Sequence, residues 1–221
     1  GAISRGEPRW KLGLLDREHQ RGAMSGLFHL VHPDGYVTYR IKSDWRDADA
    51  EHLCWLVDYI PITAEAHAAL WQTLLGIDLV TTIESHRVPL DDALPHLLTD
   101  YRRVRTTALV DGMWLRPLDV PQLLAARRYA IEVRTVVEVR DQLLGDGRYL
   151  VQGSGVEATC ARTDRTADVV LDVASLGAAY LGGTRLSTLA RAGRVLGDPD
   201  AITRLDRALL ADRLPFHGSE I

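Results

Sequence analysis

The side chains that could carry out chemistry are few and poorly grouped in this chain. Eight histidines and two cysteines are present. His29 and His32 lie three residues apart where a predicted strand meets a turn, without an HExxH pattern or a cluster of acidic partners, which indicates surface or structural roles. Cys54 and Cys160 are far apart in sequence and form no CxxC pair. We therefore expect no metal-binding residues and a reducing, cytoplasmic environment.

A serine between two glycines, Ser154, comes nearest to a nucleophile motif. A nucleophile elbow reads G-x-S-x-G, and Gln152 stands where the first glycine is needed. Hydrolase chemistry at this serine is therefore not expected. Gly153 and Gly155 instead indicate a turn between two strands.

Two further positions carry carboxylates of interest, Asp111 and the end of the chain. The pair Asp111-Gly112 favours the positive φ angles of a tight hairpin, so strands at 104–110 and 113–118 are expected to pair around it. On local pattern alone Asp111 is then a turn residue. The last residues, LPFHGSEI, bring Glu220 next to the terminal carboxylate of Ile221. A frayed terminus is the ordinary structure for such a segment.

Length and composition indicate a folded chain with room for two small domains. The chain has 221 residues, 46% of them hydrophobic and 25% charged. The net charge of -4 and a pI near 6.1 argue against nucleic-acid binding, which usually requires a basic face. No apolar run approaches the roughly 18 residues of a membrane span, and the first residues lack the apolar core of a signal peptide. We expect neither nucleic-acid nor membrane partners.

The first half of the sequence predicts a sheet with one long helix. Residues 1–26 read as a linker and a short helix with Leu12, Leu14 and Leu15 as apolar anchors. Residues 27–41 alternate around Pro33-Asp34-Gly35, which is a hairpin signal. The elements expected next are an acidic loop at 44–51, a strand at 53–60, a helix at 64–75 capped by Thr63, and a strand at 79–84.

The second half predicts a small, mostly antiparallel sheet flanked by helices. Asp119 can cap a helix at 121–128, whose first turn contains Pro121. Strands are then expected at 133–140, 149–152, 156–162 and 168–173, followed by helices at 175–181, 187–192 and 198–210.

Three segments carry a family resemblance: residues 105–128, RTTALVDGMWLRPLDVPQLLAARR, LGAAYLGG at 176–183, and AGRV at 192–195. They resemble the carboxy-terminal part of the enhanced intracellular survival (Eis) acetyltransferases, and the resemblance covers nearly the whole chain. Members of that family resemble three units in series: a GNAT domain that binds acetyl-CoA, a GNAT-like domain without cofactor, and a sterol carrier protein-like domain. The resemblance implies an α+β chain, with a GNAT-like mixed sheet and helices at 27–103 followed by a sterol carrier protein-like α/β sandwich at 104–221.

The resemblance places the cofactor outside this chain. GNAT domains hold the pyrophosphate of CoA with an Arg/Gln-x-x-Gly-x-Gly/Ala loop at a helix N-terminus. The nearest match, residues 152–157 (QGSGVE), ends in the wrong residue and lies between two strand-like runs. We therefore expect no cofactor-binding residues here, with acetyl-CoA, the co-substrate, bound by a domain that this chain does not contain.

The resemblance also implies three site residues. In the family the terminal carboxylate helps to deprotonate the acceptor amine. By position Ile221 would supply this base, on the condition that it is the true C-terminus, while Glu220 would hold a cationic acceptor. The family commonly ends in an aromatic residue, whereas isoleucine stands here. An acidic residue near the hairpin lines the family's acceptor pocket, which implies a substrate-binding role for Asp111.

The hypothesis implied by the resemblance is the acceptor-side and scaffold portion of a GNAT N-acetyltransferase. It would move acetyl from acetyl-CoA to primary amines of aminoglycosides, polyamines or lysine side chains, and would be inactive without an upstream catalytic domain. Family members form hexamers, which implies a homo-oligomer. The alternative is a stand-alone lipid-binding or oligomerisation module.

Overall fold

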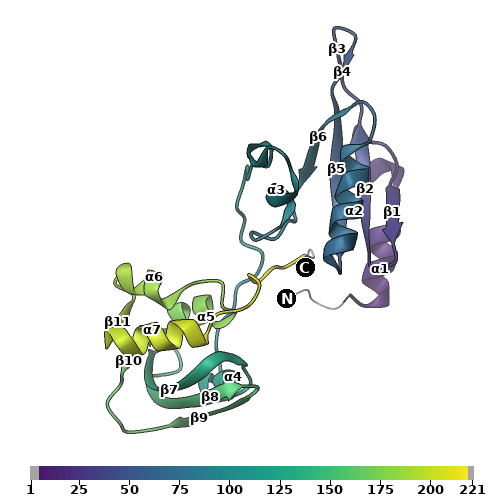
Figure 1. The fold of residues 1–221 in the computed structure, drawn as a ribbon. Helices are drawn as coiled ribbons and strands as arrows, with labels where there is room; N and C mark the ends of the chain where they lie inside the picture. The colour runs from purple at the N-terminus through teal and green to yellow at the C-terminus, as the bar shows by residue number, and fades with distance from the viewer. Residues whose placement is uncertain (1–4, 219–221) are drawn as a thin grey trace. The chain divides into compact units, whose positions relative to one another are not determined.

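The computed structural model describes residues 5–218 of the chain, which divide into two compact units. Unit 1 contains the residues up to Val110 and those from Phe216 onward, and unit 2 is Asp111–Pro215. In Figure 1 each unit is a sheet with helices packed against it. Both units mix helices and strands, which confirms the predicted α+β class.

Unit 1 is built on a four-stranded mixed sheet in the order β1-β2-β5-β6. The strands are β1 (Phe28–His32), β2 (Gly35–Lys42), β5 (His52–Pro61) and β6 (Val80–Ser85). β1, β2 and β5 pair antiparallel, and β6 runs parallel to β5. The hairpin predicted around Pro33-Asp34-Gly35 is confirmed. A Cβ at Gly35 would lie 2.7 Å from the carbonyl oxygen of Ile60, so only glycine fits where β2 passes β5.

Helix α2 (Ala64–Leu75) makes the crossover that the parallel pair of β5 and β6 requires, as Figure 1 shows. The predicted cap is confirmed, because the Thr63 side chain accepts a hydrogen bond of 3.2 Å from the backbone N–H of Ala66. Leu70, Trp71 and Leu74 on one face of α2 are buried in a hydrophobic core with residues of the sheet. These side chains therefore hold α2 on the sheet.

Several short elements complete the described part of unit 1. They are α1 (Glu7–Leu14), the two-residue strands β3 (Trp45–Arg46) and β4 (Asp49–Ala50), α3 (Leu94–Leu97), and 3-10 turns at Glu18–Gln20 and Tyr101–Arg103. The apolar anchoring predicted for Leu12, Leu14 and Leu15 is wrong, since these side chains are 65%, 57% and 47% exposed. A tryptophan takes their place, because the ring of Trp10 packs 5.9 Å from the ring of Tyr36 on β2.

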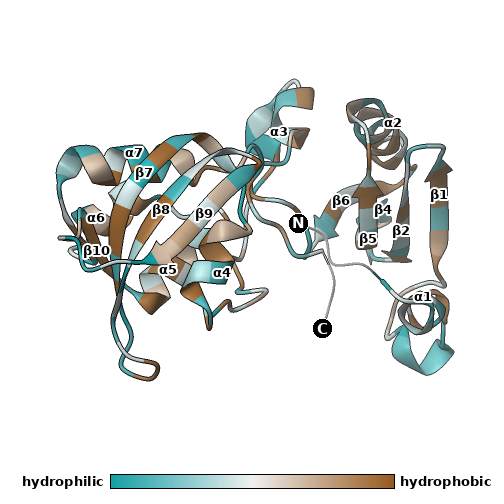
Figure 2. Cartoon of the chain, turned by 90° about the horizontal axis from the view of Figure 1, so that it is seen from below, coloured by the Kyte–Doolittle hydropathy of each residue, from teal (hydrophilic) through white to brown (hydrophobic). Residues whose placement is uncertain are grey.

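Unit 2 is built on a five-stranded sheet in the order β11-β10-β7-β8-β9. The strands are β7 (Tyr129–Arg140), β8 (Gly147–Gly155), β9 (Glu157–Arg162), β10 (Val169–Asp172) and β11 (Val195–Gly197). All neighbours pair antiparallel except β7 and β10, which confirms the predicted, mostly antiparallel sheet. Hydrophobic and hydrophilic residues alternate along β7 in Figure 2, as expected for a strand with one buried face.

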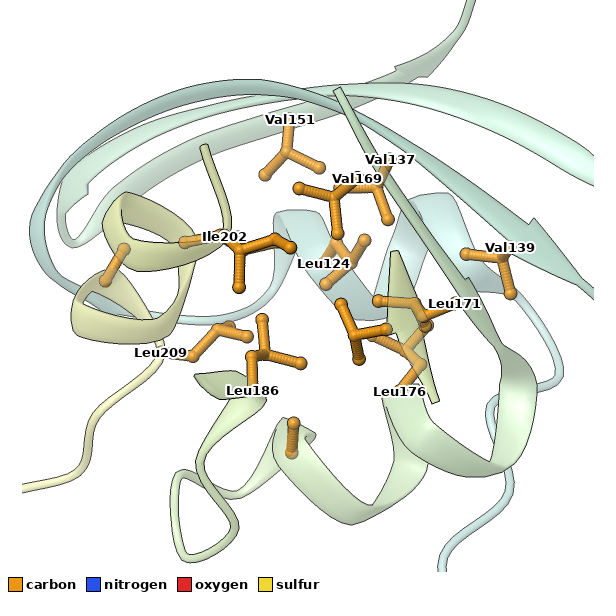
Figure 3. Close-up of a cluster of buried hydrophobic side chains, with 14 of the residues drawn as sticks. Leu124, Val137, Val139, Val151, Val169, Leu171, Leu176, Leu186, Ile202 and Leu209 are labelled. Atoms are coloured by element: carbon orange, nitrogen blue, oxygen red, sulfur yellow. The ribbon is translucent and has the colours of Figure 1, made fainter. Parts of the chain in front are cut away.

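Four helices accompany this sheet: α4 (Val120–Ala125), α5 (Val173–Tyr180), α6 (Leu186–Arg191) and α7 (Pro199–Ala208). The predicted cap of α4 is confirmed by a 2.9 Å hydrogen bond from the N–H of Gln122 to the carboxylate of Asp119. The core between sheet and helices is aliphatic, and Figure 3 shows its side chains converging from both layers. The residues labelled there are Leu124, Val137, Val139, Val151, Val169, Leu171, Leu176, Leu186, Ile202 and Leu209.

The hairpin predicted at 104–118 is wrong. Residues 104–117 contain neither helix nor strand, and Asp111 is not among the non-glycine residues with positive φ. Val110 and Trp114 are each 86% exposed. A two-stranded hairpin is marginal unless a third strand or a helix covers one face, and within the described residues nothing covers these side chains. The local turn signal is therefore not sufficient here.

The division of the chain also differs from the expected one at two points. The boundary expected between 103 and 104 lies shortly before the observed division at Val110 and Asp111, inside the same exposed segment. The residues from Phe216 onward belong to unit 1, although they were expected to belong to the second domain. The side chain of Arg5 donates a hydrogen bond to the carbonyl oxygen of Gly218, which connects this part of the chain to unit 1.

Candidate functional site

A polar cluster on the sheet of unit 1 reaches the end of the described chain. Its centre is Asp58 on β5, which faces Thr38 of β2 in the strand register. Tyr36 lies two residues before Thr38 and therefore on the same face of the sheet. The hydroxyl of Tyr36 donates a hydrogen bond of 2.6 Å to Oδ2 of Asp58.

This face is the one that α2 does not cover. Val37, between Tyr36 and Thr38 in β2, points the other way into the core that includes Leu70 of α2. The segment before β1 contacts the second face through Arg5 and Trp10. The amino-terminal segment thus supplies partners for polar side chains that the sheet alone would leave unpaired.

Arg5 is the hub of this cluster. Its Nη1 donates to Oδ2 of Asp58 and, over 3.1 Å, to the hydroxyl of Tyr36. Its Nη2 donates to Oδ1 of Asp58 over 3.0 Å and to the carbonyl oxygen of Gly218 over 2.9 Å. Arg5 and Asp58 therefore form a two-pronged ion pair that also holds the backbone near the end of the chain.

The electrostatics of the cluster keep Arg5 and Tyr36 protonated. The hydrogen bond from Arg5 to Asp58 is the main cause that raises the pKa of the guanidinium, so Arg5 stays charged. Burial first, and then the hydrogen bond to Asp58, raise the pKa of Tyr36, so its hydroxyl remains a donor. The Arg5 and Asp58 side chains are only 13% and 18% exposed, which limits screening by solvent.

A second ion-pair group fixes the same amino-terminal segment a few residues later. Asp16 accepts from the backbone N–H of Leu27 at 2.9 Å and pairs with Arg40 of β2 at 2.7 Å and Arg21 at 2.9 Å. The hydrogen bond from Leu27, followed by those from Arg40 and Arg21, lowers the pKa of Asp16 to about 2. This group does not reach the end of the chain, which makes Arg21 a useful control for Arg5.

The end of the chain lies at the limit of what the structure describes. Gly218 is buried, and Nε2 of the neighbouring His217 is buried without a hydrogen-bond partner among the described residues. Glu220 and Ile221, the predicted acceptor-binding residue and base, lie outside the described residues. The cluster nevertheless contacts the chain two residues before Glu220 and three before Ile221.

The third predicted site residue, Asp111, belongs to unit 2, where it is exposed and outside any helix or strand. The structure therefore describes it separately from the cluster of unit 1. Sequence reasoning missed Arg5, Tyr36 and Asp58 altogether. The available signal was Asp58 itself, a carboxylate in the middle of the otherwise mostly apolar strand HLCWLVDYIP.

Unit 1 also contains a histidine–carboxylate pair that the sequence analysis did not identify. Nε2 of His67 on α2 lies 3.0 Å from Oδ1 of Asp92, and both side chains are almost fully buried. The same oxygen accepts from the backbone N–H of Leu94 at 2.8 Å. The pair therefore ties the start of α3 to α2.

The glycine-rich segment of unit 2 is a hairpin turn, as predicted. Gly153 and Gly155 lie where β8 turns into β9, and Gly155 has a φ of 61°. An open cavity of about 440 Å³ adjoins it, lined mainly by Gln152–Thr159 residues, with Glu157 as its charged side chain. A carboxylate beside a strand turn repels phosphate groups, and the segment opens no helix.

Residues 5–218 contain neither a metal-binding group of side chains nor a membrane-spanning helix. No group of three or more histidine, cysteine, aspartate or glutamate side chains is arranged to hold a metal ion. None of the helices in that range has the length and apolar character needed to cross a membrane.

Comparison with protein families gives two matches, one for each half of the chain. Residues 1–117 match an acetyltransferase (GNAT) domain, and residues 120–218 match a sterol carrier protein domain. These assignments agree with the resemblance on which the expected fold was based.

Individual relatives are similar over almost the whole chain. The N-acetyltransferase Eis of Mycobacterium tuberculosis is 40% identical over 217 residues, which cover 96% of this chain and 51% of the relative. An uncharacterized N-acetyltransferase of Streptomyces avermitilis is 37% identical over 222 residues, covering 96% and 54%. The crystal structure of Eis1 from Mycobacterium abscessus superimposes with a TM-score of 0.84 at 35% identity, covering 100% of this chain and 56% of that one. The chain thus spans about half the length of the relatives it matches.

Proposed function

Because the chain belongs to the GNAT acetyltransferase family, we propose that it is the acceptor-side and scaffold portion of an N-acetyltransferase. The observation that carries this proposal is the 40% identity to an N-acetyltransferase over 96% of the chain. The reaction moves acetyl from acetyl-CoA to a primary amine of an aminoglycoside, a polyamine or a lysine side chain. Acetyl-CoA is bound by a catalytic domain in the half of the relatives that this chain does not span.

The chemical task of this chain in the proposed reaction is to bind the amine and remove a proton from it. A primary amine is protonated at neutral pH and cannot attack a thioester until it loses a proton. The terminal carboxylate of Ile221 accepts this proton, while Glu220 and Asp111 attract the cationic acceptor. The amine nitrogen then forms a bond to the acetyl carbon and the bond from carbon to sulfur breaks. The nitrogen loses its second proton as the amide forms, the departing sulfur takes up a proton, and CoA leaves as the thiol.

The experiment that tests this proposal is an acetyl-transfer assay that follows the release of free CoA thiol. The full natural gene product is compared with the 221-residue chain, using acetyl-CoA and a polyamine or an aminoglycoside. We expect turnover by the longer protein and none by the 221-residue chain. Normal turnover by the 221-residue chain would overturn the assignment of the acetyl-CoA site to another domain.

A second candidate function is favoured by one observation, the match of residues 120–218 to a sterol carrier protein domain. Such a unit could hold a fatty acyl ligand or mediate oligomerisation. Saturable binding of a fluorescent fatty acid by the 221-residue chain would support this module. We place it second because aliphatic side chains from both layers fill the described core of unit 2, as Figure 3 shows.

A further inference from the structure

We infer that Arg5 is a positioning residue that fixes the carboxy-terminal segment on the sheet of unit 1. We call Arg5, Tyr36, Asp58 and the carbonyl of Gly218 the tail clamp. Its catalytic consequence rests on the proposed function, in which the carboxylate of Ile221 acts as the base. Its structural part, the docking of the segment that ends at Gly218, can be tested independently.

The first argument is the geometry of the guanidinium. Both oxygens of Asp58 accept from the two terminal nitrogens of Arg5, and such a two-pronged pair fixes the plane of the guanidinium as well as its position. The remaining N–H of Nη2 then points in one direction, and the carbonyl oxygen of Gly218 lies there at 2.9 Å. A lysine ammonium has no such planar fork and cannot reproduce this arrangement.

The second argument is that the clamp is itself held in place. The hydroxyl of Tyr36 donates to Asp58 over 2.6 Å, so the receiving carboxylate is oriented by two strands of one sheet. The guanidinium carbon of Arg5 lies 5.3 Å from the ring centroid of Trp10, and that ring packs on Tyr36. Arg5, which lies just before α1, is therefore oriented by two strands of the sheet and by the ring of Trp10.

The third argument is the position of the contact along the chain. A Cβ at Gly183 would lie 2.7 Å from the ring of Pro215, so the chain packs on unit 2 as far as Pro215. The hydrogen bond from Arg5 fixes Gly218, three residues further on. A fixed point nearer to Ile221 in the sequence raises the local concentration of its carboxylate at the acceptor.

The structural test is hydrogen–deuterium exchange of the 221-residue chain, read on peptides that cover residues 214–221. R5Q removes the charge and the fork, and we expect faster exchange in these peptides while those of β2 and β5 stay protected. R21Q is the matched control, because Arg21 pairs with Asp16 and does not contact the tail. Unchanged tail exchange in a folded R5Q protein would overturn the inference.

The catalytic test uses the full natural gene product. We expect R5Q to lower kcat at neutral pH, with KM for acetyl-CoA unchanged, because a tail without its fixed point brings the carboxylate to the acceptor less often. The difference in kcat between R5Q and wild type should shrink toward pH 9 to 10, because the amine then loses its proton to solvent without the carboxylate. A purely structural loss of activity would not recover in this way.

Two further variants keep the test decisive. Truncation after His217 removes the Gly218 carbonyl that Arg5 binds. If Arg5 acts through the tail, R5Q should cause no additional loss of kcat in the truncated protein. Y36F removes two hydrogen bonds, the one donated to Asp58 and the one accepted from Arg5, and leaves the ion pair. It should therefore give a smaller change of the same sign even if R5Q fails to fold. A released tail with unchanged kcat would refute the role of the terminal carboxylate but not the clamp.

Discussion

Gly177 in α5 determines how the segment that follows Asp111 packs, and G177A tests this packing with a predicted sign. A Cβ at Gly177 would lie 2.5 Å from the carbonyl oxygen of Leu115 and 3.4 Å from Cδ of Pro117. Ordinary contact distances begin near 3.5 Å, so the backbone at Leu115 must move by about 1 Å. A backbone carbonyl cannot rotate away as the end of a flexible side chain can.

Two opposing effects determine the outcome of G177A. Alanine in place of glycine inside a helix gains about 0.5–1 kcal/mol. Overpacking against a fixed neighbour costs about 1–3 kcal/mol. Overpacking is the larger effect here, so we expect a net loss of about 1–2 kcal/mol, which for a unit of this size corresponds to a fall in Tm of roughly 5–10 °C.

G13A is the matched control for this prediction. Gly13 lies in the last turn of α1, and nothing comes within 4 Å of a Cβ built there. Only the gain in helix propensity applies, so stability should change by a few tenths of a kcal/mol in the favourable direction. Both proteins are measured by urea unfolding followed by circular dichroism, with hydrogen exchange of α5 as a local readout. If G177A proves as stable as wild type or more stable, the close contact between α5 and Leu115 is not a constraint of the fold.

Further predictions concern the ion pairs and caps. Asp206 of α7 is 3% exposed and accepts hydrogen bonds from Arg185 at 2.7 and 2.9 Å and from the N–H of Leu186 at 2.7 Å. D206A should therefore lower the free energy of unfolding, measured by urea titration, by about 2–3 kcal/mol. Burial opposes ionisation of Asp206, but the hydrogen bonds from Arg185 and its neighbours prevail and lower its pKa. The stabilisation that Asp206 provides is therefore present above about pH 4 and is lost as the pH falls further. In D206N the free energy of unfolding should depend less on pH in this acid range. T63A should cost about 1 kcal/mol, and equal stability to wild type would show that the cap of α2 is not needed.

Local sequence signals predicted most of the helices and strands. The Pro33-Asp34-Gly35 turn and the caps Thr63 and Asp119 act through atoms a few residues away, so the pattern contains the information that the fold uses. The hairpin expected at Asp111-Gly112 failed for the converse reason. A turn signal specifies a hairpin only where tertiary packing covers the strands, and the described residues provide no such cover.

The candidate site could not have been assembled from the sequence. Arg5 is separated from Asp58 by 53 residues and from Gly218 by 213, and no periodic pattern connects positions so distant. Only Asp58 gave a sign in advance, because a charged residue within a mostly apolar strand needs a partner. The family resemblance implies a chemical role for the tail, whereas the structure describes the contact of Arg5 with Gly218 on which the proposed clamp rests.

The most direct test of the central claim is kcat for acetyl transfer, measured by thiol release, in the full natural gene product and in a shortened form that ends at Ser219. We predict that the intact protein acetylates a polyamine or an aminoglycoside and that the shortened protein loses most of this activity at neutral pH while it still binds acetyl-CoA. Full activity in the shortened protein would contradict the assignment of the tail to the acceptor site. Absence of acetyl transfer by the intact protein to any primary amine would contradict the proposed function itself.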